Sequence, residues 1–136
     1  MTALQSHTTS NTATVAQYAA HAALTLGESV DATVRAMVAE FKTRRDAALP
    51  ILRASKAITV LPPEGAFYFY IKAPGAGREP DPSAAFCREL LEKAGVAIVP
   101  GSAFRTPDWV RVSYAADKAQ VVEAAKRIAA TADAMA

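Results

Sequence analysis

The sequence predicts an α+β domain in which helices cover one face of a small, mostly antiparallel sheet, with a long helix in front of it. The pattern in residues 58–136 is strand, strand, helix, strand, strand, helix, which packs naturally as one sheet and one helical layer. The first half is rich in alanine and shows only helical spacing. With 136 residues, 51% of them hydrophobic, the chain can bury one core plus an appendage.

The N-terminal part predicts one helix behind a polar segment. Residues 5–11 are rich in Ser and Thr, and Ser10 or Asn11 is placed to cap a helix over residues 13–26. Gly27 follows and predicts its end, because glycine readily adopts the left-handed conformation of a helix C-terminus.

A second, longer helix is predicted over residues 28–54. Its apolar residues recur three, four or seven positions apart: Val30, Val34, Met37, Phe41, Ala48 and Leu52. A helix of this length can bridge two structural units. Pro50 lacks a backbone N–H and crowds the preceding turn, so we expect a kink there or a break near Leu49.

The next segment predicts a pair of strands. Residues 58–61 and 66–73 are strand-like, and residues 62–65 (PPEG) are typical of a turn. Side chains alternate in the second strand between an apolar face, with Phe67, Phe69 and Ile71, and a face with Tyr68, Tyr70 and Lys72. The two tyrosines could border a ligand, although aromatic residues in strands more often pack against neighbours.

The remaining elements follow a loop over residues 74–80. Asp81 is placed as the N-cap of a helix, with Pro82 at its first position and Gly95 beyond its end. Strands are predicted over residues 96–99 and 110–114. A last helix then begins after its cap, Asp117, with apolar residues Val121, Ala124, Ala125, Ile128 and Ala132 at helical spacing.

The strand over residues 110–114 carries the main functional clue. Val110, Val112 and Tyr114 can face the helices, so that Arg111 points away from the core. A guanidinium group offers a rigid fork of donors that matches a carboxylate. Position alone favours another interpretation, in which Arg111 is a surface residue paired with Asp or Glu.

Composition argues against several classes of partner. The net charge of +2 comes from 15 basic and 13 acidic residues spread along the chain, which does not favour nucleic-acid binding. A single cysteine, Cys87, allows no internal disulfide and suits the reducing cytoplasm. No apolar run reaches the length of a membrane span, and no signal for export is evident, so we expect a cytoplasmic protein without a membrane partner.

Other catalytic groups are weaker candidates. Cys87 with His7 or His21 could form a nucleophile and base, but Cys87 falls on the apolar stripe of its helix, where a buried thiol is the commoner case. These residues show no metal-ligand spacing, so no metal site is expected. Gly75 and Gly77 lie in a loop without the strand and helix context of a phosphate cradle.

Six strings along the chain together resemble one enzyme family. They are LQSHTTSN (4–11), AQYAA (16–20), FKTRRD (41–46), PEGAFY (63–68), VAIVPGSAF (96–104) and VRVSYA (110–115). In this order they are similar to the C-terminal part of the aspartate and aromatic aminotransferases, which are class I/II enzymes of fold type I that use pyridoxal phosphate. The resemblance covers almost the whole chain.

This resemblance implies a role for each region. Residues 1–27 would be a remnant of the cofactor-binding large domain, a loop plus a helix. Residues 28–136 would be the small C-terminal domain, including the bridging helix over residues 28–54. In relatives the arginine of the last string binds the α-carboxylate of the substrate, which implies that role for Arg111. The substrates would be an amino acid such as aspartate and a 2-oxo acid, and residues 5–11 would lie near a dimer interface.

The chain also departs from the family pattern. The lysine that forms the Schiff base with pyridoxal phosphate lies, in relatives, in a Ser-x-x-Lys string upstream of the position of Met1. We therefore expect a truncated, catalytically incomplete chain that holds no cofactor alone and forms homo-oligomers through exposed apolar helix faces. The alternative is a non-catalytic α+β module that binds a ligand or regulates another protein.

Overall fold

A computed structural model describes residues 2–9, 11–77 and 80–136. The chain divides into two compact units, one up to Ala39 and one from Glu40 to Ala136. The boundary falls inside one helix, α3 (Glu28–Ala54).

The unit up to Ala39 is helical. It contains α1 (Thr2–Thr8), α2 (Thr14–Thr25) and the first part of α3, and neither α1 nor α2 buries a residue. The prediction of a loop over residues 5–11 is wrong for α1, where the Thr8 hydroxyl donates to the carbonyl of Leu4 at 2.9 Å and so is satisfied inside the helix.

Capping of α2 also differs from the prediction. The N-cap is Ala13, with no side-chain hydrogen bond, so Asn11 does not cap the helix; Ser10 lies outside the described residues. The side-chain amide of Gln17 donates to the carbonyl of Thr12 at 2.7 Å, which links the start of α2 to the preceding segment but satisfies none of the free backbone N–H groups of the helix. The predicted end is confirmed by Gly27, whose φ of 53° follows the last turn.

Helix α3 continues through Pro50, so the expected break near Leu49 is wrong. Ala48 and Leu52 on one side of the helix are fully buried in the core, whereas Pro50 is exposed. The packing of this buried side maintains the helix across the hydrogen bond that proline cannot donate.

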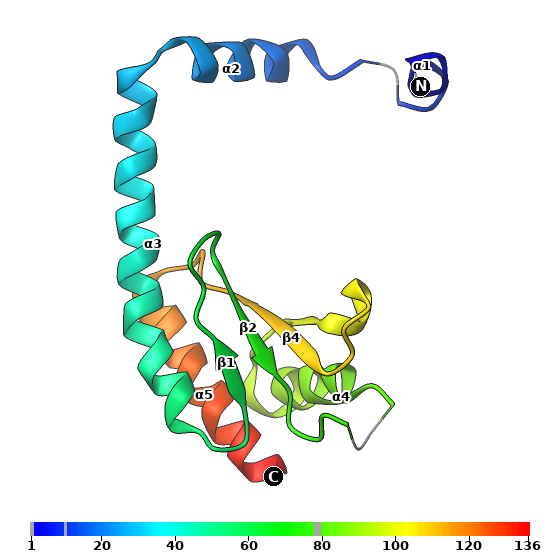
Figure 1. Cartoon of the computed structure of the whole chain (residues 1–136), viewed down its shortest axis with the longest axis vertical. Helices are drawn as coiled ribbons and strands as arrows, with labels where there is room; N and C mark the ends of the chain where they lie inside the picture. Colours follow the sequence, from blue (N-terminus) through cyan, green and yellow to red (C-terminus); the bar gives the residue numbers. More distant parts are fainter. Residues whose placement is uncertain (1, 10, 78–79) are drawn as a thin grey trace. The chain divides into compact units, whose positions relative to one another are not determined.

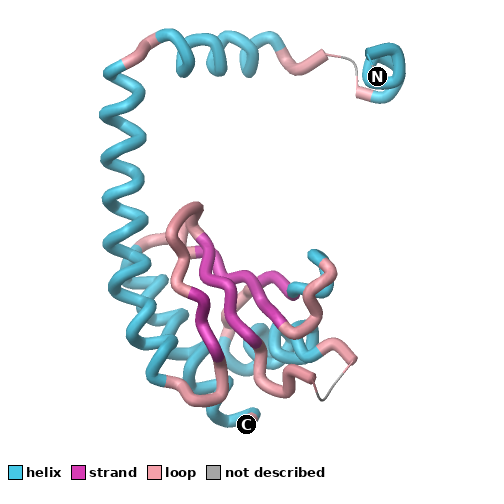
Figure 2. The backbone as a smooth tube through the Cα atoms, viewed as in Figure 1, coloured by secondary structure: helices cyan, strands magenta, loops and turns pink. Residues whose placement is uncertain are grey.

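The unit from Glu40 onward is built on one antiparallel sheet. Its strands are β1 (Thr59–Leu61), β2 (Tyr68–Lys72), β3 (Val99–Pro100) and β4 (Trp109–Ser113), in the spatial order β1-β2-β4-β3. Figure 1 labels β1, β2 and β4 side by side in this order, and Figure 2 shows these strands in magenta. The strand predicted over residues 96–99 is largely absent, because the Val96 amide donates instead to the carbonyl of Leu90 and closes the preceding helix. Pro100 is tolerated because β3 is an edge strand.

Helices cover one face of this sheet, as predicted. The C-terminal half of α3, α4 (Pro82–Glu89) and α5 (Lys118–Met135) surround the core (Figure 1). Asp81 and Asp117 cap α4 and α5 by accepting backbone hydrogen bonds, as predicted. Helix α4 continues as a π-helical turn, η1 (Leu90–Ala94), and ends at Gly95, whose φ is 64°. The sheet contributes Val60, Phe69, Ile71, Val110 and Val112 to the core.

Candidate functional site

The sheet face opposite the helices carries Arg111. Alternation in β4 buries Val110 and Val112 and leaves Arg111 half-buried on the other face, as the sequence predicts. In the antiparallel register Arg111 stands directly between Tyr70 of β2 and Val99 of β3. The centre of the sheet therefore holds this guanidinium group on its open face.

Two aromatic rings cover the guanidinium of Arg111. Its central carbon, Cζ, lies 4.5 Å from the ring centroid of Tyr68 and 4.3 Å from that of Phe104. The Nε atom is buried and has no hydrogen-bond partner. Among the described residues, Arg111 makes neither an ion pair nor a hydrogen bond, so the interpretation of a surface arginine paired with Asp or Glu is not supported.

Phe104 is held over Arg111 by a tight loop. The short 3₁₀ helix η2 (Gly101–Phe104) is closed by Thr106, whose amide and hydroxyl donate to the carbonyl of Gly101 at 2.9 and 3.1 Å. Tyr70 of the central strand shares a hydrogen bond between its hydroxyl and that of Thr106. The loop is thus fastened to the sheet beside Arg111.

A second link joins η2 to the start of α4. The Ser83 hydroxyl donates to Oδ1 of Asp81 at 2.7 Å, and the Ser102 amide donates to the Ser83 hydroxyl at 3.3 Å. The hydrogen bonds from Ser83 and from the Ala84 amide lower the pKa of Asp81. Ser83 is fully buried, so this link lies within the packed interior of the unit.

The two tyrosines of β2 have different neighbours. Tyr68 lies against Arg111, while Tyr70 stacks on Trp109 with ring centroids 5.3 Å apart and planes 4° apart. Both therefore pack within the chain, and Tyr68 also borders the candidate site. Sequence reasoning did not single out Phe104, because residues in an irregular loop follow no period that would reveal their direction.

Cys87 does not have the environment of a nucleophile. Burial, followed by the negative charge of Asp81, raises the pKa of this thiol to about 11, so that it is protonated at neutral pH.

Within residues 2–9, 11–77 and 80–136, no group of three His, Cys, Asp or Glu side chains could hold a metal ion. In the same ranges, no helix combines the length and the apolar character needed to cross a bilayer.

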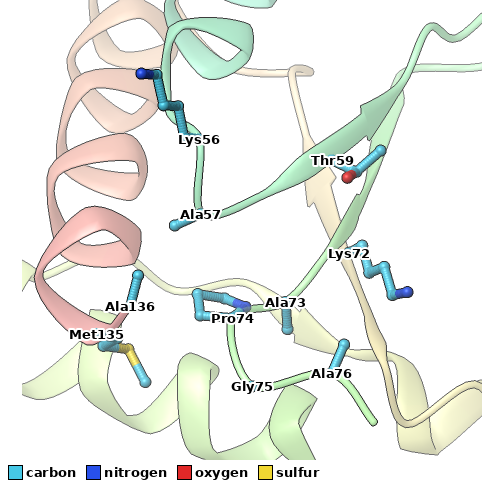
Figure 3. Close-up of a pocket in the computed structure, with 10 residues that line it drawn as sticks. All are labelled: Lys56, Ala57, Thr59, Lys72, Ala73, Pro74, Gly75, Ala76, Met135 and Ala136. Atoms are coloured by element: carbon cyan, nitrogen blue, oxygen red, sulfur yellow. The ribbon is translucent and has the colours of Figure 1, made fainter.

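A pocket of about 420 Å³ lies beside the start of β1 and the end of β2, and Arg111 does not line it. Its lining includes Lys56, Thr59, Lys72 and Gly75 (Figure 3). The two lysine side chains extend in opposite directions in this view, so they do not converge on one ligand.

The fold and the site together define an α+β domain in which Arg111, without an ion-pair or hydrogen-bond partner among the described residues, lies on the sheet face away from the helices. The family model for aminotransferase class I and II matches residues 1–128 of the chain. The aspartate aminotransferase of Thermotoga maritima is 42% identical over 125 residues, which are 92% of this chain and 30% of that protein. A probable aspartate/prephenate aminotransferase of Aquifex aeolicus is 40% identical over 92% of this chain and 32% of its own length.

Solved structures give the same result. The aspartate aminotransferase of Thermus thermophilus with maleate aligns with a TM-score of 0.80 and 34% identity, over 95% of this chain and 32% of that one. The enzyme of Rhizobium meliloti aligns with a TM-score of 0.78 and 35% identity, over 98% of this chain and 34% of that one. The chain belongs to the class I and II aminotransferase family and spans about a third of the length of these relatives.

Proposed function

We propose that this chain supplies the substrate-carboxylate site of a pyridoxal-phosphate-dependent aminotransferase, with Arg111 as the residue that binds the α-carboxylate. The reaction of the whole enzyme would transfer an amino group between an amino acid, such as aspartate, and a 2-oxo acid. The observation that carries the proposal is the unpaired guanidinium of Arg111 on the open face of the sheet. Its planar fork of donors matches the two oxygens of a carboxylate in a bidentate pair.

Family membership implies pyridoxal phosphate as the cofactor of the complete enzyme. We propose that this chain does not anchor the cofactor covalently and does not transaminate alone, because a Schiff-base lysine needs a desolvated or otherwise tuned amine. The lysines do not fit this requirement, since all six are exposed and Lys93 is paired with Glu89, which raises its pKa. The six are Lys42, Lys56, Lys72, Lys93, Lys118 and Lys126.

The absorbance spectrum of the chain mixed with pyridoxal phosphate tests the proposal that the chain does not anchor the cofactor covalently. We expect no stable aldimine band that depends on one particular lysine. A band that a single Lys→Ala change abolishes, while the other five such changes leave it intact, would contradict it.

We also propose a division into family domains at Gly27. Residues 1–27 would belong to the large domain and residues 28–136 to the small one. The backbone supports this boundary, because α2 ends before the left-handed Gly27 and α3 begins immediately after it.

Self-association is proposed for the unit up to Ala39. Its helices leave large apolar side chains exposed, namely Val15, Tyr18, Leu24, Leu26, Val34, Met37 and Val38. Exposed apolar side chains on helices favour contact with a second copy. Sedimentation velocity should show concentration-dependent oligomers that Val34→Glu weakens, and a strictly monomeric chain would refute the proposal.

The free thiol of Cys87 supports our further proposal of a cytoplasmic location.

The carboxylate site is tested by titrating the ¹⁵N-labelled chain with maleate. We expect a saturable shift of the Nε–Hε signal of Arg111 and of backbone signals on the open sheet face. Arg111→Gln should weaken binding at least about tenfold, because it removes the charge-assisted hydrogen bonds.

The matched control is Arg88→Gln, which makes the same change in charge at an exposed position of α4. It should leave maleate affinity unchanged. Equal loss in both variants would mean that maleate responds to net charge alone, and it would refute the assignment of Arg111.

A further inference from the structure

The rings of Tyr68 and Phe104 limit how a ligand can reach Arg111. Their centroids lie 4.5 and 4.3 Å from Cζ, and the Nε atom is buried. The two terminal nitrogens have no partner among the described residues and are not among the buried unpaired atoms. The accessible part of the guanidinium is therefore the edge formed by Nη1 and Nη2.

We propose that Tyr68 and Phe104 are positioning residues, which fix the plane of the Arg111 guanidinium so that a carboxylate binds end-on to its two terminal nitrogens. This inference rests on the proposed function for its ligand, but the ordering of Arg111 stands on the geometry alone. Arginine has many rotamers, and a side chain that is ordered before binding loses less conformational freedom when the ligand arrives.

The contacts with Arg111 indicate that the aromatic rings, and not a polar group, hold its guanidinium in place. Rings stabilise a cation over their faces through their electron distribution as well as through apolar packing. The hydroxyl of Tyr68 makes no hydrogen bond among the described residues, so its ring is the part that meets Arg111. Phenylalanine at position 68 should therefore preserve the role.

Phe104 can position Arg111 although it lies in a connecting segment, because that segment is held at both ends by hydrogen bonds. Thr106 closes it onto Gly101 and shares a hydrogen bond with Tyr70, while Ser102 donates to buried Ser83. These contacts connect the ring to the central strand and to the start of α4. The position of Phe104 is thus set by the sheet that carries Arg111.

The experiment compares the Nε–Hε signal of Arg111 without ligand in the wild type, Tyr68→Leu, Phe104→Leu and Tyr68→Phe. The signal is assigned by its loss in Arg111→Lys. In the wild type and in Tyr68→Phe we expect a ring-current shift and slow solvent exchange. Each leucine variant should move the signal toward the position of an exposed arginine and speed its exchange.

Maleate titrations of the same proteins measure the consequence. We expect the leucine variants to raise the dissociation constant about threefold to tenfold, and Tyr68→Phe to change it less than about twofold. Val99→Ala is the matched control, because Val99 lies directly opposite Arg111 on the same face but carries no ring. It should leave both readouts unchanged.

The outcomes separate the two proposals. Leucine variants with the wild-type Arg111 signal, or with wild-type maleate affinity when the wild type binds, would overturn the positioning role. Failure of the wild type to bind maleate would overturn the proposed function, and the ligand-free signals would then decide whether the rings order Arg111. Loss of fold does not confuse the result, because Phe104 is 46% exposed and thermal unfolding of each variant is measured alongside.

Discussion

Gly101→Ala is the substitution that should disturb the site most sharply without touching Arg111. A Cβ atom at position 101 would lie closer than 3.0 Å to the backbone carbonyl oxygens of both Thr106 and Trp109. Neither oxygen can move as a flexible side chain would. The loop that carries Phe104 must therefore shift, and the hydrogen bonds that Thr106 donates to Gly101 must lengthen or break.

The expected cost follows from overpacking against backbone. Inserting a methyl group into a close-packed position costs typically 1–3 kcal/mol, and two backbone contacts at one position favour the upper end, about 3 kcal/mol. For a unit of the size of Glu40–Ala136 this corresponds to a fall in Tm of roughly 12–24 °C. Maleate binding should weaken as well, because Phe104 leaves its place over Arg111.

Thermal and urea unfolding, followed by circular dichroism, measure this cost. The control is Gly65→Ala, where an added Cβ meets nothing within 4 Å and φ is not positive. That change should be neutral or slightly stabilising, because it reduces the freedom of the unfolded chain. A Gly101→Ala variant as stable as Gly65→Ala would refute the description of this loop.

Three further predictions concern the framework. Ile128→Ala, at a fully buried position of α5, should lower the free energy of unfolding by about 2–5 kcal/mol, whereas Leu91→Ala, at a position 58% exposed, should change it by less than about 0.5 kcal/mol in denaturant titrations. The pKa of Asp81 is lowered in the folded state, so the stability that its carboxylate contributes is present above its ordinary pKa and is lost as the pH falls through the lower folded pKa. The difference in the free energy of unfolding between wild type and Asp81→Ala should therefore be full at pH 6 and shrink in strong acid. Cys87 should react with iodoacetamide at pH 8 more than about 100-fold more slowly in the native chain than in urea, because burial raises its pKa to about 11, and equal rates would contradict this environment.

The sheet and its helices follow from side-chain periodicity. Alternation placed Phe69, Ile71, Val110 and Val112 on the buried face, and the structure agrees. This works because both strands have one covered face, so a shift of one residue would expose the apolar set. Strand ends were less predictable, as in residues 96–99, where closure of the preceding helix competes with strand pairing.

Local signals in the N-terminal unit predicted less. Ser and Thr over residues 5–11 favour caps and turns, yet the structure has α1 there, and the hydroxyl of Thr8 is satisfied within it by the carbonyl of Leu4 one turn earlier. Pro50 predicted a kink or a break near Leu49, and the structure contradicts the break, since α3 continues through Pro50 with Ala48 and Leu52 buried on either side of it. In both regions the decisive contacts depend on geometry that a pattern of residue types does not contain.

The site was predictable in part. Alternation indicated that Arg111 points away from the core, and the structure places it there. Its aromatic neighbours were not predictable, since Phe104 lies in a loop and its place depends on hydrogen bonds between segments distant in sequence, such as the one from Ser102 to Ser83. Strand periodicity gives the direction of a side chain, but the contacts of a loop require the folded chain.

The most direct test of the central claim is the ratio of the dissociation constants for maleate between wild type and Arg111→Lys. Lysine keeps the positive charge but lacks the planar fork of donors. We expect the Arg111→Lys variant to bind maleate about tenfold more weakly than the wild type, a difference in binding free energy of about 1.4 kcal/mol. Equal affinity of the two proteins would show that charge alone attracts the carboxylate, and it would contradict the assignment of Arg111 as the substrate-carboxylate site.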